Sequence, residues 1–208
     1  MITKRSQSTY SSKNIKIEED RVLSYQFNCY GFVNHCIEVC HPEAYEQLVW
    51  AMNHVLVKAI PPSSDGQPCP FNYTSALTHL PLSEWQTVEA LSDIIPGDIL
   101  VYLPPNFHPP KDADFSKKST GTHIMIVDQV LEKIGDTYQF IIIDSTRIPH
   151  SKQDTRYPKG SGIGRSPVFL TPHENIVLLQ WSLKGKKHEK AITIGRVLPS
   201  KPLFSIQA

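Results

Sequence analysis

The sequence has few cysteines, and their number and spacing argue against a disulfide-rich scaffold and a structural zinc site. Its 208 residues contain four cysteines and no Cys-x-x-Cys pair. A disulfide-rich scaffold needs a higher density of cysteines, and a structural zinc site needs well-spaced pairs of Cys or His ligands. Cys36, Cys40 and His41 come nearest to such a set, but their spacing favours the buried face of a helix. We therefore expect reduced cysteines, with no metal and no cofactor.

Long apolar runs are also missing. No stretch approaches the roughly 20 apolar residues that a membrane-spanning helix requires. The N-terminal segment MITKRSQSTYSSKNIKIEEDR lacks the apolar run of about 7 to 15 residues that a secretory signal needs. We expect no membrane span. A cytoplasmic location, export without an N-terminal signal and a trimmed secreted form all stay open, as does the oligomeric state.

Neither sign of charge dominates. The chain has 21 basic and 20 acidic residues, which gives a formal net charge of +1. No dense Lys/Arg stripe interleaves with aromatic residues, so nucleic acid is not an expected partner. With 40% hydrophobic and 20% charged residues, the composition is that of a globular protein with a packed core. The length fits a flexible arm at residues 1–20 followed by a single domain at 21–208.

The predicted elements are helices first and strands afterwards. Asn28 is a suitable N-cap for a first helix, and Pro42 starts a second. Residues 60–92 are rich in Pro, Ser and Gly and are expected to form an inserted loop or cap, with a short helix near residue 87. Strands follow at 99–103, in a hairpin spanning 121–146, and at 163–170, 175–183 and 190–198. This order predicts an α+β fold, with N-terminal helices packed on a central antiparallel β-sheet.

Three residues combine into a possible nucleophilic site. Cys29 falls in the first turn of the first helix, where unpaired N–H groups and the helix dipole favour a thiolate and should lower its pKa. His123 opens the first strand of the hairpin and Asp144 closes the second, with a short turn expected around Gly135 and Asp136. Folding about residues 133–134 would bring the two side chains side by side. The carboxylate would orient the imidazole and leave its other ring nitrogen facing the sulfur. This is the arrangement of a Cys-His-Asp catalytic triad.

The segments NCYGFVNHCIE, PGDILVYL and GTHIMIVDQV resemble, in order and spacing, the signature segments of the NlpC family of bacterial cell-wall peptidases. That family is part of the papain-like cysteine peptidase superfamily, and the resemblance covers roughly residues 25–145. It implies a papain-like fold, with Cys29 as nucleophile, His123 as base and Asp98 as a structural or near-site residue. Two positions depart from the family: Tyr30 replaces a small serine, and Asp144 stands where His, Asn or Gln is commoner.

The resemblance implies an acyl-enzyme mechanism and a peptide substrate. Members of the family mostly cleave peptidoglycan stem peptides next to a D-glutamyl residue, so the first hypothesis is a peptidoglycan peptidase or amidase. The oxyanion would be held by the Cys29 backbone N–H, with Tyr25 or Gln26 as a second donor. A thiol acyltransferase or deamidase acting on a protein or lipid substrate is the second hypothesis. A binding module without catalysis is the third.

The segment after Asp144 holds further candidates. His150, Asp154 and Arg156 lie in a stretch that leaves the end of this strand, and such loops often bind substrate. Arg156 could hold a substrate carboxylate in a bidentate fork. An ion pair between Asp154 and Arg156 that stabilises the loop is the more common arrangement.

Overall fold

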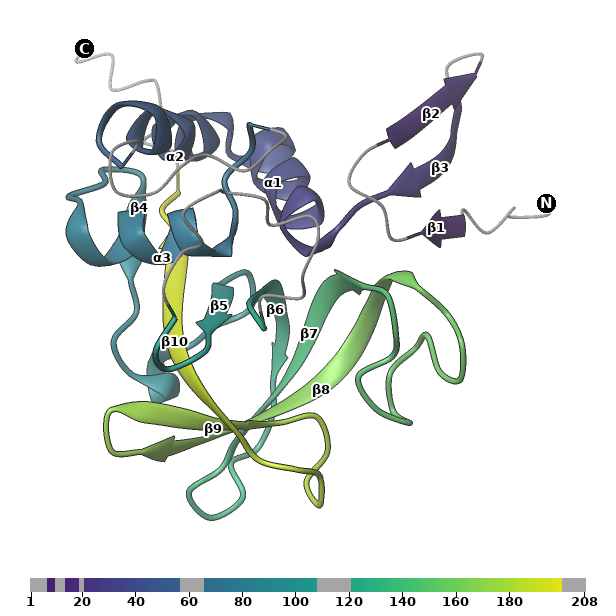
Figure 1. Ribbon diagram of the computed structural model, residues 1–208, viewed down its shortest axis with the longest axis vertical. Coiled ribbons are helices and arrows are strands. Elements are labelled where there is room, and N and C mark those ends of the chain that lie inside the picture. The colour runs from purple at the N-terminus through teal and green to yellow at the C-terminus, as the bar shows by residue number, and fades with distance from the viewer. Residues whose placement is uncertain (1–6, 10–13, 19–20, 57–65, 108–120, 200–208) are drawn as a thin grey trace, which may run out of the picture.

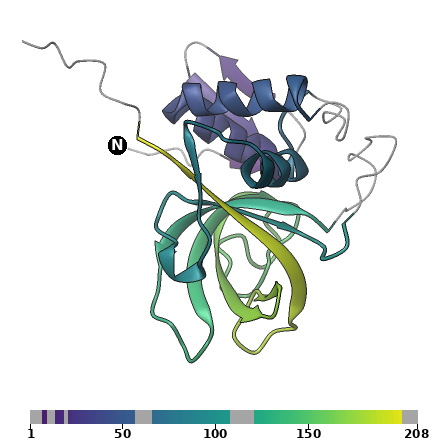
Figure 2. The ribbon, with the colours of Figure 1, turned by 90° about the vertical axis from the view of Figure 1, so that its left-hand side faces the viewer.

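Helices and strands separate into two layers in the computed structural model, which describes residues 7–9, 14–18, 21–56, 66–107 and 121–199 (Figure 1). The helices α1 (Cys29–Cys40), α2 (Pro42–His54) and α3 (Pro70–His79) gather above the main sheet. Figure 2 shows this layering from the side, with the sheet curling below the helices and β10 (His188–Val197) rising past them. None of these described helices is long and apolar enough to cross a membrane.

The first helix begins where the sequence predicts. The side chain of Asn28 accepts a hydrogen bond from the backbone N–H of Gly31 at 2.6 Å, which confirms the predicted N-cap. One face of α1 packs against the sheet through Phe32, Val33 and Ile37. The prediction of a buried face extending to Cys40 is wrong, because this last residue of the helix is exposed.

The main sheet is antiparallel throughout and closes on itself. Its order is β4-β10-β5-β6-β7-β8-β9, and β10 pairs with β9 as well as with β5. The first residues of β10 bond to β9 and the following ones to β5, so one long strand joins both edges. The strands are β4 (Trp85–Thr87), β5 (Ile99–Leu103), β6 (His123–Val130), β7 (Tyr138–Thr146), β8 (Gly162–His173) and β9 (Ile176–Gln180). Six of the seven strands therefore form a barrel, with β4 added outside.

Alternate residues of the central strands build two cores. In β5, the fully buried Val101 belongs to the cluster shared with the helices, whereas its neighbour Leu100 belongs to the cluster within the barrel. Ile124 and Met125 of β6 divide in the same way. The predicted strand at 99–103 is therefore present, and it is buried on both faces.

Several predictions need correction. The α+β composition is right, and the helices do pack on an antiparallel sheet, but this sheet is not open, because β10 closes it into a barrel. The short helix expected near residue 87 is instead β4, and α3 lies in the stretch expected to be a loop or cap. Within the expected N-terminal arm, β1 (Gln7–Thr9) and β2 (Asn14–Glu18) pair with β3 (Arg21–Gln26) as a small separate sheet. A cap over the site stays a prediction, and residues 57–65 lie outside the described part of the chain.

Candidate active site

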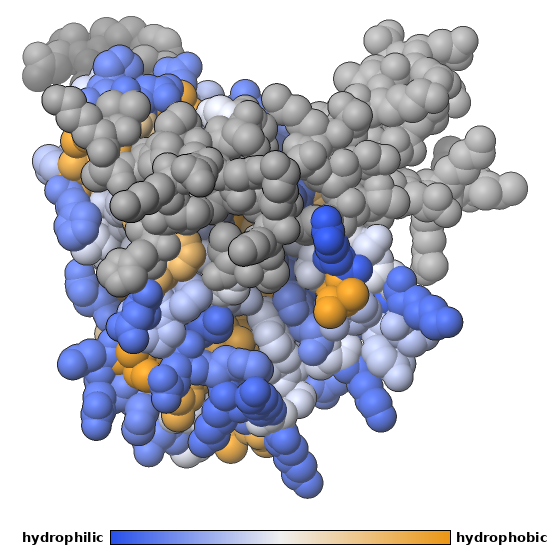
Figure 3. All heavy atoms as spheres, viewed as in Figure 1, coloured by the Kyte–Doolittle hydropathy of each residue, from blue (hydrophilic) through white to orange (hydrophobic). Residues whose placement is uncertain are grey.

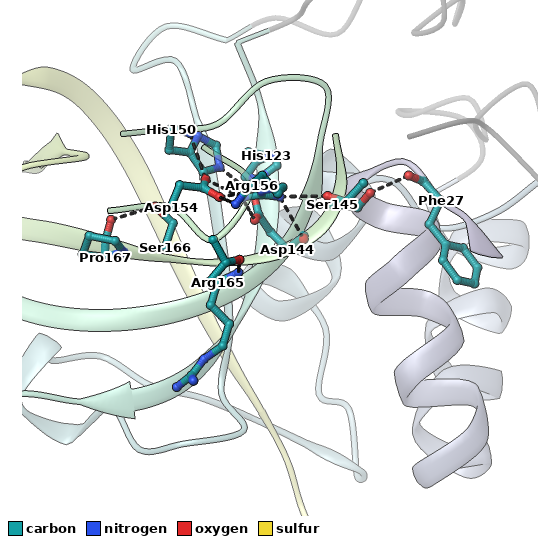
Figure 4. Close-up of polar contacts among 12 residues, drawn as sticks. Phe27, His123, Asp144, Ser145, His150, Asp154, Arg156, Arg165, Ser166 and Pro167 are labelled. Atoms are coloured by element: carbon teal, nitrogen blue, oxygen red, sulfur yellow. Dashed lines mark hydrogen bonds and ion pairs between the residues drawn. The ribbon is translucent and has the colours of Figure 1, made fainter. Parts of the chain in front are cut away.

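His123 and Asp144 meet on neighbouring strands of the barrel. His123 is the first residue of β6, and its Nε2 is hydrogen-bonded to Oδ2 of Asp144 in β7 (Figure 4). The carboxylate is fully buried and the imidazole is 7% exposed. The buried contact leaves Nδ1 as the ring nitrogen available to another group.

The strand register makes this contact diagonal rather than directly cross-strand. Ile126 pairs with Ile143, so Asp144 lies across from Met125, two residues beyond His123. The turn lies at Gly135 and Asp136, as predicted, and Gly135 has a φ of 57°. The midpoint expected at residues 133–134 is therefore displaced by two residues. A bulge between Val127 and Gln129 contributes to the offset. Diagonal neighbours on one face of a sheet still lie within reach of long side chains, so the pair forms despite the shifted register.

A hydrogen bond between β7 and the residue before the N-cap positions the start of α1. The hydroxyl of Ser145, directly after Asp144, donates to the backbone carbonyl of Phe27 at 2.5 Å (Figure 4). This holds the start of α1 against the strand that carries the carboxylate. Cys29, the first residue of α1, is buried and is a hydrogen-bond partner of His123. The structure thus brings Cys29, His123 and Asp144 together in the order expected of a triad.

The charges in this cluster favour a protonated imidazole. Burial by itself would lower the pKa of His123, but the negative charge of Cys29 and the hydrogen bond with Asp144 outweigh it and raise the pKa to about 10. Burial would likewise raise the pKa of Asp144, yet hydrogen bonds from His123 and His150 hold it well below its ordinary value. At neutral pH the cluster therefore holds a proton on His123 and a negative charge on Asp144.

A second histidine reaches the same carboxylate. Nε2 of His150 lies 2.7 Å from Oδ2 of Asp144, the oxygen that also bonds to His123. The His150 ring is stacked on Trp181, with centroids 3.6 Å apart and planes tilted by 5°. Burial lowers the pKa of His150, so it is neutral at pH 7 and donates its N–H to the carboxylate. The sequence analysis placed His150 in a candidate substrate-binding loop, whereas the structure places its ring against Asp144.

Arg156 completes the surroundings of Asp144 from the other side. Its Nη2 donates to Oδ1 of Asp144 at 2.7 Å and to Asp154 at 2.8 Å, and its Nε donates to Asp154 at 2.8 Å. Its Nη1 donates to the carbonyls of Asp144 and Gly162 at 3.2 and 2.9 Å. All five guanidinium N–H groups are thereby used within the protein. Arg156 has no donor left for a substrate carboxylate, and the ion pair with Asp154 is the arrangement observed.

The glycines at 160 and 164 explain how this arginine fits. A Cβ on Gly164 would lie 2.6 Å from Nε of Arg156, and one on Gly160 would lie 2.7 Å from the Arg156 carbonyl oxygen. Larger residues at either position would displace the arginine. Gly160 and Gly164, closely spaced in the sequence, were the signal that could have indicated a large side chain packed against this stretch.

The other predicted site residues have different surroundings. Asp98 is fully buried and accepts hydrogen bonds from Arg196 and from the backbone N–H of Ile95, which is a structural role linking β5 to β10. Tyr30 is partly buried against the helix-side core. Tyr25 and Gln26 lie in β3, whose side chains are outside the described part of the structure. The ring of Tyr102, which was not predicted, lies 5.7 Å from that of His123 on the paired position of β5.

The same cluster could in principle hold a metal ion. Ligand atoms of His123, Asp144 and His150 all lie within 4.8 Å of one another. However, Asp144 already bonds to both histidines and to Arg156, whose positive charge would repel a cation at this carboxylate. The donors fit a hydrogen-bonded charge network better than a metal site.

Comparisons with known proteins identify no family for the chain, so the geometry of the site is the main evidence for its function. No family model matches the chain, and no solved structure matches it. An uncharacterized protein of Acanthamoeba polyphaga mimivirus is 26% identical over 155 residues, which is 63% of this chain and 64% of that protein. The papain-like fold expected from the resemblance is therefore corrected: the chain is an α+β protein with a closed barrel, and it has no matching neighbour of that fold.

Proposed function

We propose that the chain is a cysteine hydrolase that cleaves an amide bond with Cys29 as nucleophile, His123 as general base and acid, and Asp144 as the residue that orients the histidine. The observation that carries the proposal is the buried histidine, which contacts the thiol of Cys29 and the carboxylate of Asp144. Such an arrangement activates a weak nucleophile and fixes the tautomer of its base. The three groups come from a helix start and two strands, and Ser145 ties these elements together.

The proposed reaction follows from the positions of the protons. In the first step the Cys29 sulfur attacks the carbonyl carbon of the substrate as a thiolate while His123 holds the proton. The resulting tetrahedral oxyanion lies at the start of α1, where the backbone N–H of Cys29 has no partner within the helix. His123 then protonates the departing amine, and the C–N bond breaks to leave a thioester. A water molecule gives its proton to His123 and its oxygen adds to the thioester carbonyl. The C–S bond then breaks, which releases the acid product and regenerates the thiolate–imidazolium pair.

The substrate class that the sequence supports best is a peptidoglycan stem peptide. This part of the proposal rests on the three segments that resemble the NlpC family. The mechanism depends on the geometry of the triad, whereas the substrate depends on the resemblance alone, so the two can fail separately.

A hydrolysis assay tests both parts. The chain is incubated with a synthetic stem peptide that contains a γ-D-glutamyl bond, and the products are identified by mass spectrometry. We expect cleavage by the wild type and a loss of at least about a thousandfold in Cys29→Ala. Cys40→Ala is the matched control, because Cys40 is an exposed residue of the same helix.

Two results would contradict the proposal in different ways. Equal cleavage by Cys29→Ala and the wild type would exclude Cys29 as the nucleophile. No cleavage of any stem peptide by a protein whose Cys29 reacts selectively with electrophiles would exclude the substrate class and leave the nucleophile.

A further inference from the structure

The loop between β7 and β8 encloses a groove of about 550 Å³ that is separate from the triad. Three basic side chains line it, from Arg147, Lys152 and Lys159, and no carboxylate does. Ile148 and Tyr157, which are 71% and 51% exposed, add apolar surface. In Figure 3, hydrophilic residues surround a small hydrophobic group on the right-hand side of the barrel, the side on which this loop lies in Figure 1.

Within the loop, Lys152 and Lys159 have no surface carboxylate to pair with. Asp154 is the one acidic residue between Arg147 and Gly160. It lies beneath the surface, 4% exposed, with both carboxylate oxygens accepting hydrogen bonds from Arg156. These two lysines therefore give this part of the groove a positive charge, and concave surfaces concentrate such a field. A negatively charged ligand is the complementary partner.

The backbone of the loop is held in place before any ligand binds. The N–H of Thr155 donates to the carbonyl of Arg165 in β8 at 2.9 Å, and the N–H of Gly160 donates to the carbonyl of Arg156 at 2.6 Å. Asp154 also accepts from the backbone N–H of His150 at 2.9 Å. Because little ordering is then needed on binding, the lysines are presented on a fixed frame.

The groove adjoins the proposed catalytic site. Pro149 and Ser151 line it, and the residue between them, His150, bonds to Asp144 and has its ring 5.5 Å from that of His123. A peptide spans about 3.3 Å per residue, so a few residues of substrate would connect the two sites.

We infer that this groove binds a carboxylate-bearing segment of the peptide that Cys29 cleaves. The inference rests on the proposed function for the identity of the peptide. Carboxylates on aliphatic side chains fit better than inorganic phosphate, because Ile148 and Tyr157 can pack against the apolar parts of such side chains while Lys152 and Lys159 bind the charges.

The test measures binding without turnover. Isothermal titration calorimetry is carried out on the full chain with Cys29→Ala, using hexaglutamate, hexaglutamine and tripolyphosphate as probes. We expect hexaglutamate to bind at low ionic strength, to weaken as salt is raised, and to bind more tightly than either other probe. Lys152→Glu/Lys159→Glu should weaken it at least about tenfold. Lys184→Glu/Lys187→Glu is the matched control, with the same change of charge on exposed residues outside the groove.

Each other outcome would overturn the assignment. Equal binding of hexaglutamine would show that charge is not recognised, and tighter binding of tripolyphosphate would make the groove a phosphate site. Equal weakening by both double substitutions would mean that net charge alone drives binding. None of these binding measurements needs an active Cys29. A groove that does not bind carboxylates can therefore be distinguished from a chain that does not hydrolyse amides.

Discussion

Replacing Arg156 with methionine removes the buried guanidinium that neutralises two carboxylates beside the triad. The Arg156 side chain is 4% exposed, and both Asp144 and Asp154 are completely buried at their side chains. Methionine fills a similar volume but donates no hydrogen bond, so two buried negative charges lose their positive partner. Removing one partner of a buried ion pair costs about 3–5 kcal/mol. For a chain of this length that corresponds to a fall in Tm of about 6–20 °C.

Arg165→Met is the matched control for this prediction. Arg165 pairs with Asp128 at the sheet surface, where its side chain is 47% exposed, so the loss of that pair should cost less than about 1 kcal/mol. Thermal unfolding of both variants is followed by circular dichroism at pH 7 beside the wild type. If Arg156→Met lowers the Tm no further than Arg165→Met does, the buried network does not stabilise the fold as argued.

Three smaller perturbations test the positioning of the site and its charge. Ser145→Ala should lower the free energy of unfolding by about 1 kcal/mol in urea titrations and should slow the alkylation of Cys29. Ser166→Ala, which changes another buried serine, should leave the alkylation of Cys29 unchanged. Asn28→Ala should cost about 0.5–2 kcal/mol and Asn28→Asp much less, and equal losses would exclude a capping role. Because the pKa of His123 is raised from 6.5 to about 10, its stabilising contribution is complete below pH 6.5 and is lost as pH rises toward 10. The stability difference between the wild type and His123→Phe should therefore shrink over that range, and a constant difference would contradict the raised pKa.

Local signals in the sequence were sufficient for the elements of the site. Asn28 caps a helix through its own side chain, so a cap followed by a helical apolar stripe could be recognised without knowing the rest of the fold. Gly135 likewise marks the turn of the hairpin that carries His123 and Asp144. The sequence alone could not place α1 against this hairpin, because the bond from Ser145 to Phe27 joins residues 118 positions apart.

The surroundings of Asp144 could not be predicted either, because they also depend on contacts between distant parts of the chain. The stacking of His150 on Trp181 depends on how a loop after β7 folds back toward the end of β9, and no periodic pattern encodes that contact. Closure of the barrel depends on β10 pairing with two strands at once, which follows from the twist of the whole sheet. The resemblance to a known family supplied a fold, a substrate and the placement of α1 against the hairpin together. The papain-like fold proved wrong, whereas Cys29, His123 and Asp144 do meet.

The most direct test of the account is the alkylation rate of each cysteine as a function of pH, measured by mass spectrometry on the wild type and on His123→Ala. Burial raises the pKa values of Cys36 and Cys69 to about 11, so these thiols should react only at alkaline pH. We predict rapid labelling of Cys29 that persists well below about pH 8 and is greatly slowed in His123→Ala. If Cys29 instead follows the pH profile of Cys69, and His123→Ala changes nothing, Cys29 and His123 do not form a reactive pair.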